Sequence, residues 1–377
     1  MRTTLIAEQL FDGKTLYENH PISIEDGKII AFDTIKGAIE NKVSGLLTAG
    51  FIDTQVNGGG GYLLNQDTNL HTLKAMTNAH AKFGTSSLLP TLITSNVKKI
   101  EQTANLISTA LAQNTPGIIG VHFEGPHISE PKKGIHSSQQ IRGISQQELD
   151  IYCRDDLGLK VVTLAPESVN FDIIKTLVAS NVHVCLGHSN ATFAQTQAAL
   201  AAGASGFTHL FNAMSALESR EPNMVGAALL DEQSWCGLIL DGHHVHPSTA
   251  KLAYKLKAAH KMMLVTDSMS TIGSEQTHLQ FDGHQISLTG DKLTSNTGQL
   301  AGSALNMITA VNNAVKMLNI PFIDALKMAS LYPAQFLGIA DSYGQLAIGS
   351  NADLTLISTT NSSPHIVNTW IGGRAIF

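Results

Sequence analysis

Eight short apolar segments, separated by stretches of helical periodicity, constrain the fold of this 377-residue chain more than any other feature. Apolar runs of strand length that alternate with helix-period segments indicate βα units and a parallel sheet. The predicted strands are 50–56, 85–92, 117–124, 159–165, 183–188, 206–211, 236–241 and 262–267. The predicted helices are 69–82, 96–113, 170–180, 191–202, 247–259, 303–318 and 321–337. Eight βα units predict an α/β fold, a TIM-like (β/α)8 barrel over 49–343.

Both ends of the chain have strand-like sequences outside this pattern. Near the N-terminus, TTLIAEQLF and PISIEDGKIIAF surround an Asp26-Gly27 turn, a dipeptide typical of β-hairpins. The C-terminal segments GQLAIGSNADLTLIS and VNTWIGGRAIF are also strand-like. Because so short a piece buries little apolar surface alone, we expect 1–48 and 344–377 to form one small, discontinuous β-sandwich domain. Segment 275–300 is expected to be a β-hairpin inserted after the eighth strand.

Composition excludes several classes of function. The net charge of −6 and the lack of any basic block argue against a nucleic-acid partner. Three widely spaced cysteines, with no C-x-x-C pair, are typical of reduced thiols. The N-terminus carries acidic residues where a signal peptide has its apolar core, and no apolar run reaches the ~20 residues of a membrane helix. We therefore expect a cytoplasmic protein with no membrane partner.

Potential metal ligands stand at the ends of three predicted strands. Glu124 ends the apolar run GVHF, His188 follows HVCLG, and His209 follows GFT. The carboxyl ends of barrel strands meet on one rim, so these side chains are expected to lie close together. Two imidazoles and one carboxylate suit Zn²⁺ or Fe²⁺ and leave a coordination position open. Taken singly, each residue is equally consistent with a hydrogen-bonded structural role; the repetition at three strand ends favours a metal site.

Further polar residues follow the same pattern. Asp267, after the eighth strand, is placed to accept a proton from a water molecule and return it to a leaving group, although an aspartate there also suits a helix N-cap. His136 and Arg220 are loop residues that suit a carbonyl oxygen or an anion. Competing motifs are incomplete: GHSNA lacks the last glycine of G-x-S-x-G, H-E-x-x-H is absent, and NGGGG is not a dinucleotide fingerprint.

With these residues assembled, the chain resembles the amidohydrolase superfamily and, within it, the N-acetylglucosamine-6-phosphate deacetylase family. The resemblance runs nearly from end to end. It rests on AGFIDTQVNG, GVHFEGPHI, KGIH, LGHSNA, HLFNAM, REP, DGHHV, VTDSM, LAGSAL and GQLAIGSNADLTL, in this order.

The resemblance implies roles for individual residues. Many members of the superfamily carry H-x-H after the first strand; Gln55 and Asn57 stand there instead, as vestigial second-metal positions, which implies a single metal. By resemblance, Glu124, His188 and His209 hold that ion, Asp267 is the catalytic acid and base, and His136 faces the acetyl group. The implied substrate contacts are Ile135, Asn212, Ala213, His244 and the backbone of Leu300, Ala301, Gly302 and Ser303, together with Arg220, which reaches the phosphate from the neighbouring subunit of a homodimer.

The function so implied is metal-dependent hydrolysis of N-acetylglucosamine 6-phosphate, a small-molecule substrate of amino-sugar catabolism, to glucosamine 6-phosphate and acetate. Alternatives are N-acetylgalactosamine 6-phosphate or another linear or cyclic amide on the same scaffold, and a non-catalytic homologue. Zinc is the first candidate for the metal, with Fe²⁺ or another divalent cation as the alternative. The sequence leaves open the metal used in the cell, the epimer, the choice between dimer and tetramer, and the rates and regulation.

Overall fold

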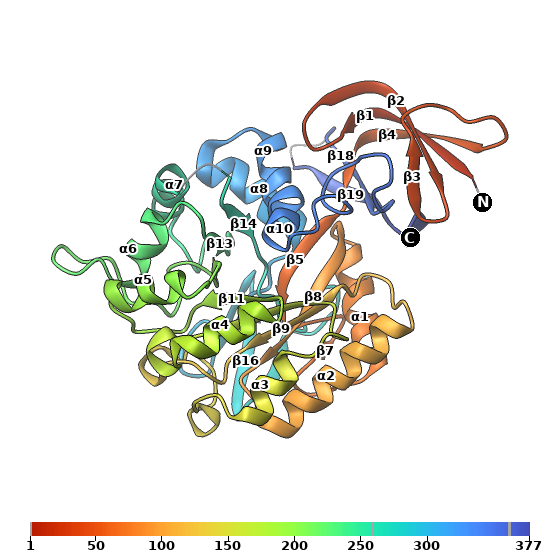
Figure 1. The fold of residues 1–377 in the computed structure, drawn as a ribbon. Helices are drawn as coiled ribbons and strands as arrows, with labels where there is room; N and C mark the ends of the chain where they lie inside the picture. Colours follow the sequence, from red (N-terminus) through yellow and green to blue (C-terminus); the bar gives the residue numbers. More distant parts are fainter. Residues whose placement is uncertain (1, 258–259, 361–362) are drawn as a thin grey trace.

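The computed structural model describes residues 2–257, 260–360 and 363–377. At its centre lies an eight-stranded sheet with the order β14-β13-β12-β11-β10-β9-β8-β5, in which every paired neighbour is parallel (Figure 1). Its strands are β5 (Phe51–Val56), β8 (Thr85–Ile93), β9 (Gly120–Glu124), β10 (Leu159–Leu164), β11 (Val182–Leu186), β12 (Gly206–Phe207), β13 (Trp235–Leu238) and β14 (Met262–Leu264). A parallel bridge between Val56 and Ser268 links the first strand to the segment after the last one. The predicted (β/α)8 barrel is confirmed, with all eight strands in place.

Helices surround this barrel, and two of them were not predicted. The helices are α1 (Leu70–Ala81), α2 (Val97–Ala112), α3 (Gln146–Tyr152), α4 (Phe171–Ala179), α5 (Phe193–Ala201), α6 (Asn223–Leu230), α7 (Pro247–Leu256), α8 (Met307–Ala314), α9 (Phe322–Ala329) and α10 (Leu331–Phe336). The missed helix α3 has a capping box of Ser145 and Glu148 as its sequence signal. The missed helix α6 is buried at six of its eight positions, so its sequence shows no amphipathic period.

The boundaries of the remaining helices differ in detail from the prediction. The segment 303–318 becomes helical only at Met307, after the N-cap Asn306, and its last turn is a π-helix, η4 (Val315–Asn319). The segment 321–337 is two helices, because Ser330 leaves the helical conformation between α9 and α10. Positions 258–259 of the predicted helix 247–259 lie outside the described residues.

The two ends of the chain share a second sheet, visible at the upper right of Figure 1 beside both termini. Its order is β20-β19-β18-β4-β1-β2-β3. The strands are β1 (Thr3–Phe11), β2 (Leu16–Glu25), β3 (Lys28–Ala31), β4 (Ile39–Ala49), β18 (Leu354–Ser358), β19 (His365–Ile371) and β20 (Arg374–Ala375). N-terminal β4 pairs with C-terminal β18, and a separate hydrophobic cluster that includes Leu10, Leu47 and Trp370 packs on this sheet. The proposed division at 48 and 344 stays a prediction; β4 ends at Ala49, directly before the barrel.

The insert after the eighth strand is larger than predicted. Instead of a hairpin it forms a three-stranded antiparallel sheet of β15 (His278–Phe281), β16 (His284–Thr289) and β17 (Lys292–Ser295). Its apolar side packs on Leu63, Ile93 and Ile135 beside the barrel. A second small sheet pairs β6 (Gly58–Gly59) with β7 (Tyr62–Leu63). The insert therefore covers part of the rim that carries the strand ends.

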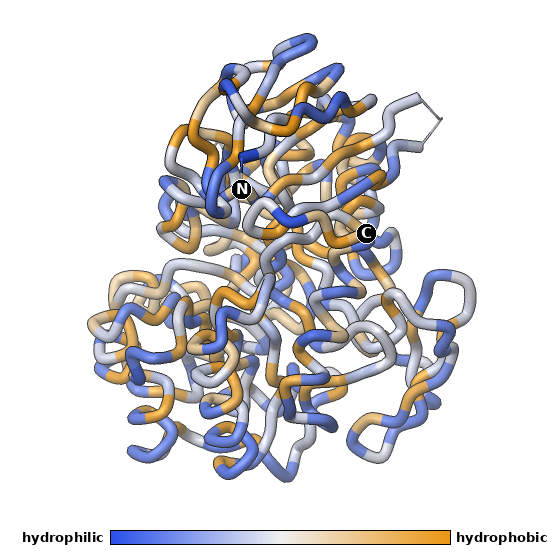
Figure 2. The backbone as a smooth tube through the Cα atoms, turned by 90° about the vertical axis from the view of Figure 1, so that its right-hand side faces the viewer, coloured by the Kyte–Doolittle hydropathy of each residue, from blue (hydrophilic) through white to orange (hydrophobic). Residues whose placement is uncertain are grey.

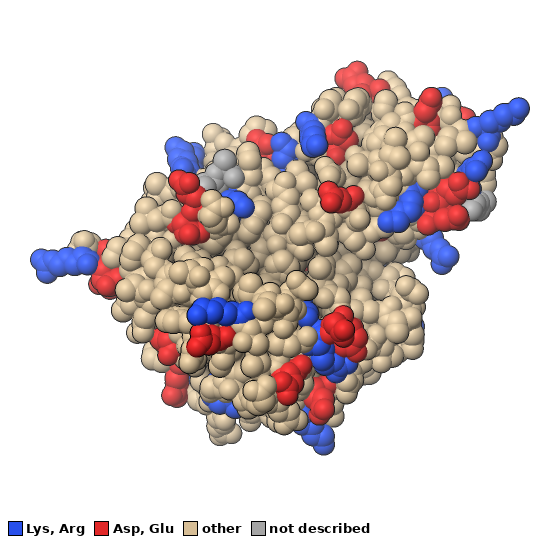
Figure 3. All heavy atoms as spheres, viewed as in Figure 1, with Lys and Arg blue, Asp and Glu red and all other residues tan. Residues whose placement is uncertain are grey.

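Hydropathy and charge follow this architecture. Figure 2 shows apolar positions running through the inside of both units, with hydrophilic positions at the outer turns. On the face drawn in Figure 3, acidic and basic side chains are interspersed, with no surface of a single sign. Among the described residues, no helix combines the length and apolar character needed to cross a membrane.

Candidate metal centre and active-site cavity

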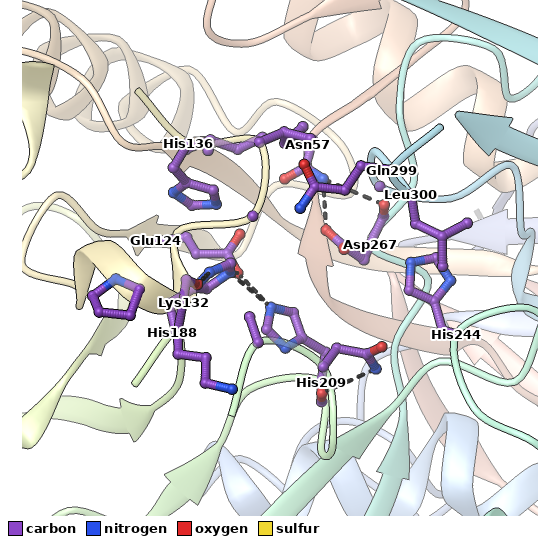
Figure 4. A pocket seen from close by; sticks show the side chains of 17 residues that line it. Asn57, Glu124, Lys132, His136, His188, His209, His244, Asp267, Gln299 and Leu300 are labelled. Atoms are coloured by element: carbon purple, nitrogen blue, oxygen red, sulfur yellow. Dashed lines mark hydrogen bonds and ion pairs between the residues drawn. The ribbon is translucent and has the colours of Figure 1, made fainter. Parts of the chain in front are cut away.

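A cavity of about 310 Å³ opens at the carboxyl ends of the barrel strands (Figure 4). Most residues predicted for the site line it, although they come from distant parts of the chain. The lining residues are Asn57, Ile93, Glu124, Pro131, Lys132, Gly134, Ile135, His136, His188, His209, Asn212, Ala213, His244, Asp267, Gln299, Leu300 and Gly302. Sites in barrels of this class lie at this rim because the loops that follow the strands converge there.

The three predicted metal ligands meet in this cavity. Glu124 ends β9, whereas His188 and His209 follow β11 and β12. Glu124 Oε1 lies 3.0 Å from His209 Nε2 and 3.3 Å from His188 Nε2, and the two imidazole nitrogens are 3.0 Å apart. All three side chains are buried. The donor atoms thus face a common point, as ligands of one ion do.

The chemistry of this donor set fits a divalent cation. Burial by itself raises the pKa of Glu124, but hydrogen bonds to His188 and His209 and their charges outweigh burial and hold it well below its usual range, so the carboxylate is ionised. His188 donates Nδ1–H to the carbonyl oxygen of Lys132 at 2.9 Å. In the neutral ring, this leaves the lone pair of Nε2 directed at the cluster, which is the usual arrangement of a metal-binding histidine.

Asp267, after β14, lies on the other side of the cavity and is held by two amides. Asn57 Nδ2 donates to its Oδ1 at 2.7 Å, and Gln55 Nε2 donates to the same oxygen at 3.1 Å. Both amides therefore bind the same oxygen, and no described residue donates a hydrogen bond to Oδ2. Burial, together with the negative charge of Glu124, raises the pKa of Asp267 to about 6. A carboxylate with such a pKa is suited to accept and return a proton near neutral pH.

The amide of Gln55 has a second partner in the site. Gln55 Nε2 also donates to Glu124 Oε1 at 3.0 Å, so one amide group bridges the two carboxylates of the site. Two buried carboxylates repel each other unless a cation or hydrogen-bond donors lie between them. The amide of Gln55 supplies such a donor to both carboxylates.

The backbone of the site is strained at the functional residues. His188, His209 and Asp267 have φ values of 47°, 36° and 51°, in the left-handed region that costs non-glycine residues about 1–3 kcal/mol each. Long-range hydrogen bonds hold the Asp267 conformation: its N–H donates to Gln55 O, and its carbonyl accepts from Ser303 N. This backbone turns the three side chains away from the strand direction and into the cavity.

His136 lies above the metal cluster, on the loop after β9. Its ring is 4.3 Å from that of His188, and its Nδ1 lies 2.7 Å from Thr94 Oγ1. Burial, followed by the charge of His188, lowers its pKa well below the usual range. A neutral imidazole therefore faces the cavity close to the predicted metal ligands.

The predicted substrate contacts fall into three groups. Ile135, Asn212, Ala213, His244, Leu300 and Gly302 line the cavity. Ala301 is fully buried, and the Ser303 hydroxyl donates to Thr266 O, so neither side chain faces the cavity. Arg220 lies outside the cavity of its own chain, on the exposed segment 216–220.

Two consecutive histidines in the loop after β13 have different partners. Asp241 Oδ2 accepts from His244 Nδ1 at 2.6 Å, which fixes His244 on the cavity wall. His243 turns instead to Asp291, at the turn between β16 and β17, with 2.8 Å between Nε2 and Oδ1.

Sequence reasoning missed several functional positions. Lys132 lines the cavity. It directly precedes the motif KGIH, in which the prediction included only Ile135 and His136, so its position in the sequence could have indicated it. Gln299 directly precedes the motif LAGSAL and also lines the cavity. Thr94 follows β8, a strand for which no polar end residue was considered. Nothing in its local sequence distinguishes this hydroxyl from others in the core.

Comparisons with known proteins agree with this geometry. The model of the amidohydrolase family matches residues 46–376. The N-acetylgalactosamine-6-phosphate deacetylase of Shewanella sp. (strain ANA-3) is 46% identical over 334 residues, covering 89% of this chain and 84% of that protein. The N-acetylglucosamine-6-phosphate deacetylase of Vibrio furnissii is 33% identical, covering 98% and 94%. The crystal structure of N-acetylglucosamine-6-phosphate deacetylase from Pasteurella multocida superposes with a TM-score of 0.94 at 33% identity, covering 100% of this chain and 99% of that one.

Proposed function

Because the chain belongs to the amidohydrolase family, we propose that it hydrolyses the acetamide of N-acetylglucosamine 6-phosphate to glucosamine 6-phosphate and acetate. The observation that carries the proposal is the buried cluster of Glu124, His188 and His209 with Asp267 across the same cavity. The names of the relatives supply the substrate class, a phosphorylated N-acetyl amino sugar. The intact ligand set argues against a non-catalytic homologue.

Glu124, His188 and His209 would hold one divalent cation, with zinc as the first candidate and Fe²⁺ as the alternative for the same ligands. When bound, the cation polarises the acetyl carbonyl and lowers the pKa of a neighbouring water molecule. The single-metal assignment is supported by Gln55 and Asn57, whose amide groups donate to carboxylates instead of presenting imidazoles.

Asp267 carries the proton through the reaction. Its free Oδ2 removes a proton from the attacking water as the oxygen adds to the acetyl carbon. Protonated Asp267 then donates to the amine nitrogen as the C–N bond breaks, because an amide anion is a poor leaving group. His136 donates a hydrogen bond to the oxygen that gains negative charge, a contribution of about 3 kcal/mol for a well-placed donor. The products are the free amine and acetic acid, which releases the second proton of the water to solvent as it becomes acetate.

The other walls of the cavity suit the sugar phosphate. Asn212, Ala213 and His244 form one side, and the backbone at Leu300 and Gly302 forms another. We assign Arg220 to the phosphate of the neighbouring subunit in a homodimer. The assignment is supported by its place on an exposed segment, beside Leu217, which is 55% exposed. A cytoplasmic location is also proposed, supported by three unpaired cysteines, two of them buried.

N-acetylgalactosamine 6-phosphate is the second candidate substrate. The specific observation in its favour is the 46% identity to the Shewanella deacetylase that carries this name, against 33% for the Vibrio furnissii enzyme. The two sugars differ in the configuration of one hydroxyl group, so the metal, Asp267 and His136 would act alike on both.

The deciding experiment measures acetate release from both sugar phosphates and from unphosphorylated N-acetylglucosamine, with and without chelation followed by zinc. We expect chelator-sensitive release that strongly prefers a phosphorylated sugar, and the ratio of kcat/KM values identifies the epimer. Release that survives complete removal of the metal would contradict the metal assignment. No release from either phosphorylated sugar by metal-loaded protein would contradict the proposed substrate.

A further inference from the structure

Thr94 is not a predicted metal ligand, but it contacts both the metal cluster and His136. It directly follows β8 and is 6% exposed. Its N–H donates to the carbonyl oxygen of Glu124 at 2.8 Å, and its Oγ1 lies 2.7 Å from His136 Nδ1. Thr94 therefore lies against the backbone of one predicted metal ligand and against the ring that faces the acetyl group.

The chain makes room for this hydroxyl at Gly125. A Cβ atom added to Gly125 would lie 2.2 Å from Thr94 Oγ1, a distance that real atoms do not adopt. Gly125 also has a φ of 80°, which favours glycine. The loop after β9 can thus approach the end of β8 because residue 125 is a glycine. This approach places the Thr94 hydroxyl next to His136 Nδ1.

Two distances favour one direction for the hydrogen bond between Thr94 and His136. The hydroxyl has one hydrogen and two acceptors in reach, His136 Nδ1 at 2.7 Å and Glu124 O at 3.4 Å. A separation of 3.4 Å is long for a hydroxyl donor, and Glu124 O already accepts from Thr94 N. The shorter distance therefore favours a hydroxyl that donates its hydrogen to Nδ1. In a neutral imidazole whose Nδ1 accepts, Nε2 carries the hydrogen.

We propose that Thr94 is a positioning residue that holds His136 in the tautomer with hydrogen on Nε2, so that the ring presents a donor to the developing oxyanion. The proposal rests on the proposed function, because an oxyanion forms only if an amide is hydrolysed. The opposite tautomer would direct a lone pair at the oxyanion and would repel it. A donor oriented before the reaction stabilises the transition state more than one that must first exchange its hydrogen.

Three variants test the proposal in the metal-loaded protein. Thr94→Val removes the hydroxyl at nearly constant volume, and Thr94→Ser keeps it. Thr85→Val is the matched control: Thr85 is a buried residue at the start of β8, the strand that Thr94 follows, and its hydroxyl has no partner among the described residues. We expect Thr94→Val to lower kcat at least about tenfold with KM for the sugar phosphate within about twofold. Thr94→Ser and Thr85→Val should keep kcat within about threefold, with equal metal content in all variants.

Two further measurements separate positioning from a general structural effect. In the His136→Asn background, Thr94→Val should cause no additional loss, because Thr94 acts only through the ring. In protein labelled with ¹⁵N-histidine, the His136 signal, identified by its loss in His136→Asn, should show hydrogen on Nε2 in the wild type and a mixture of tautomers in Thr94→Val. This second readout is independent of turnover and still decides the hydrogen bond if the proposed substrate is wrong. Normal kcat in Thr94→Val, an undiminished loss in the His136→Asn background, or wild-type His136 with hydrogen on Nδ1 would each overturn the proposal.

Discussion

Asn57 Nδ2 lies 2.7 Å from Asp267 Oδ1, although the two residues are 210 positions apart in the chain. Together with Gln55, Asn57 occupies the positions where many members of the superfamily carry two histidine ligands. Here the two amides hold a carboxylate that lines the cavity, and both bind its Oδ1. We propose that amides at these two positions direct the proton carrier and hold no second metal.

Replacement of Asp267 by asparagine tests that proton carrier. Asp267→Asn keeps the shape of the side chain but accepts no proton from water, so kcat should fall by about 10²–10⁴-fold. The melting temperature and the metal content should stay close to those of the wild type, since Glu124, His188 and His209 are unchanged. A kcat near the wild-type value would refute the role of Asp267 as base and acid.

Replacement of Asn57 by aspartate should change the pH dependence of kcat/KM. Asn57→Asp puts a second negative charge against Asp267 and removes a donor, and both changes raise the pKa of Asp267 above its value of about 6. Because the base must be ionised, the acid limb of the kcat/KM profile should move to higher pH, and the variant should lose more activity at pH 6 than at pH 9. Asn105→Asp, on α2 and outside the cavity lining, is the matched control. An unmoved acid limb would show that Asp267 does not control it.

The proposed role of Arg220 in the neighbouring subunit predicts complementation between two impaired variants. Arg220→Ala should raise KM for the sugar phosphate at least about tenfold with a smaller effect on kcat, whereas exposed Lys98→Ala should change neither. If Arg220 acts in the neighbouring subunit, a mixed dimer of Arg220→Ala and Asp267→Asn contains one complete site. Refolding equal amounts together should then recover roughly a quarter of the wild-type activity at low substrate. Absence of recovery, with mixed dimers demonstrated by mass, would place Arg220 outside the neighbouring site.

Buried His80 should make stability depend on pH. Burial lowers its pKa to about 4, against the opposing effect of its hydrogen bond to Gly58 O. Between pH 6.5 and about 4, His80 binds fewer protons in the folded protein than in the unfolded chain. Its contribution to the free energy of unfolding is therefore fully present above pH 6.5 and is lost as the pH falls toward 4. The loss amounts to about 3 kcal/mol for one such histidine.

The variant His80→Gln keeps a donor for Gly58 O and removes the titration. It should therefore show a shallower loss of unfolding free energy between pH 7 and 4.5 than the wild type, measured by urea denaturation. The difference in slope between wild type and His80→Gln comes from His80 alone, because Asp53 is present in both proteins. Asp53 changes the free energy of unfolding with the opposite sign, since burial raises its pKa to about 7. Equal slopes in both proteins would contradict the account.

Much of the fold follows from the sequence because local patterns encode it. The eight strands are recognisable because each is a short apolar run, and their carboxyl ends bear Glu124, His188, His209 and Asp267. One rule of barrel topology is sufficient to bring these four residues to one rim. The elements that were missed have weak local signals: α6 is buried almost all round, α3 is only seven residues long, and the third strand of the insert follows a polar turn.

The tertiary structure alone decided which atoms face which. Gln55 meets Glu124 and Asp267 across separations of 69 and 212 positions, and Thr94 meets His136 across 42. No local pattern encodes such contacts, because they arise only when the barrel closes and the loops pack on one another. For the same reason the sequence did not reveal that Lys132 reaches the cavity while Ala301 and the Ser303 hydroxyl turn inward. The sequence determined which chemical groups gather at the rim; closure of the barrel determined their orientation, and with it which oxygen of Asp267 and which nitrogen of His136 are bound by neighbouring side chains.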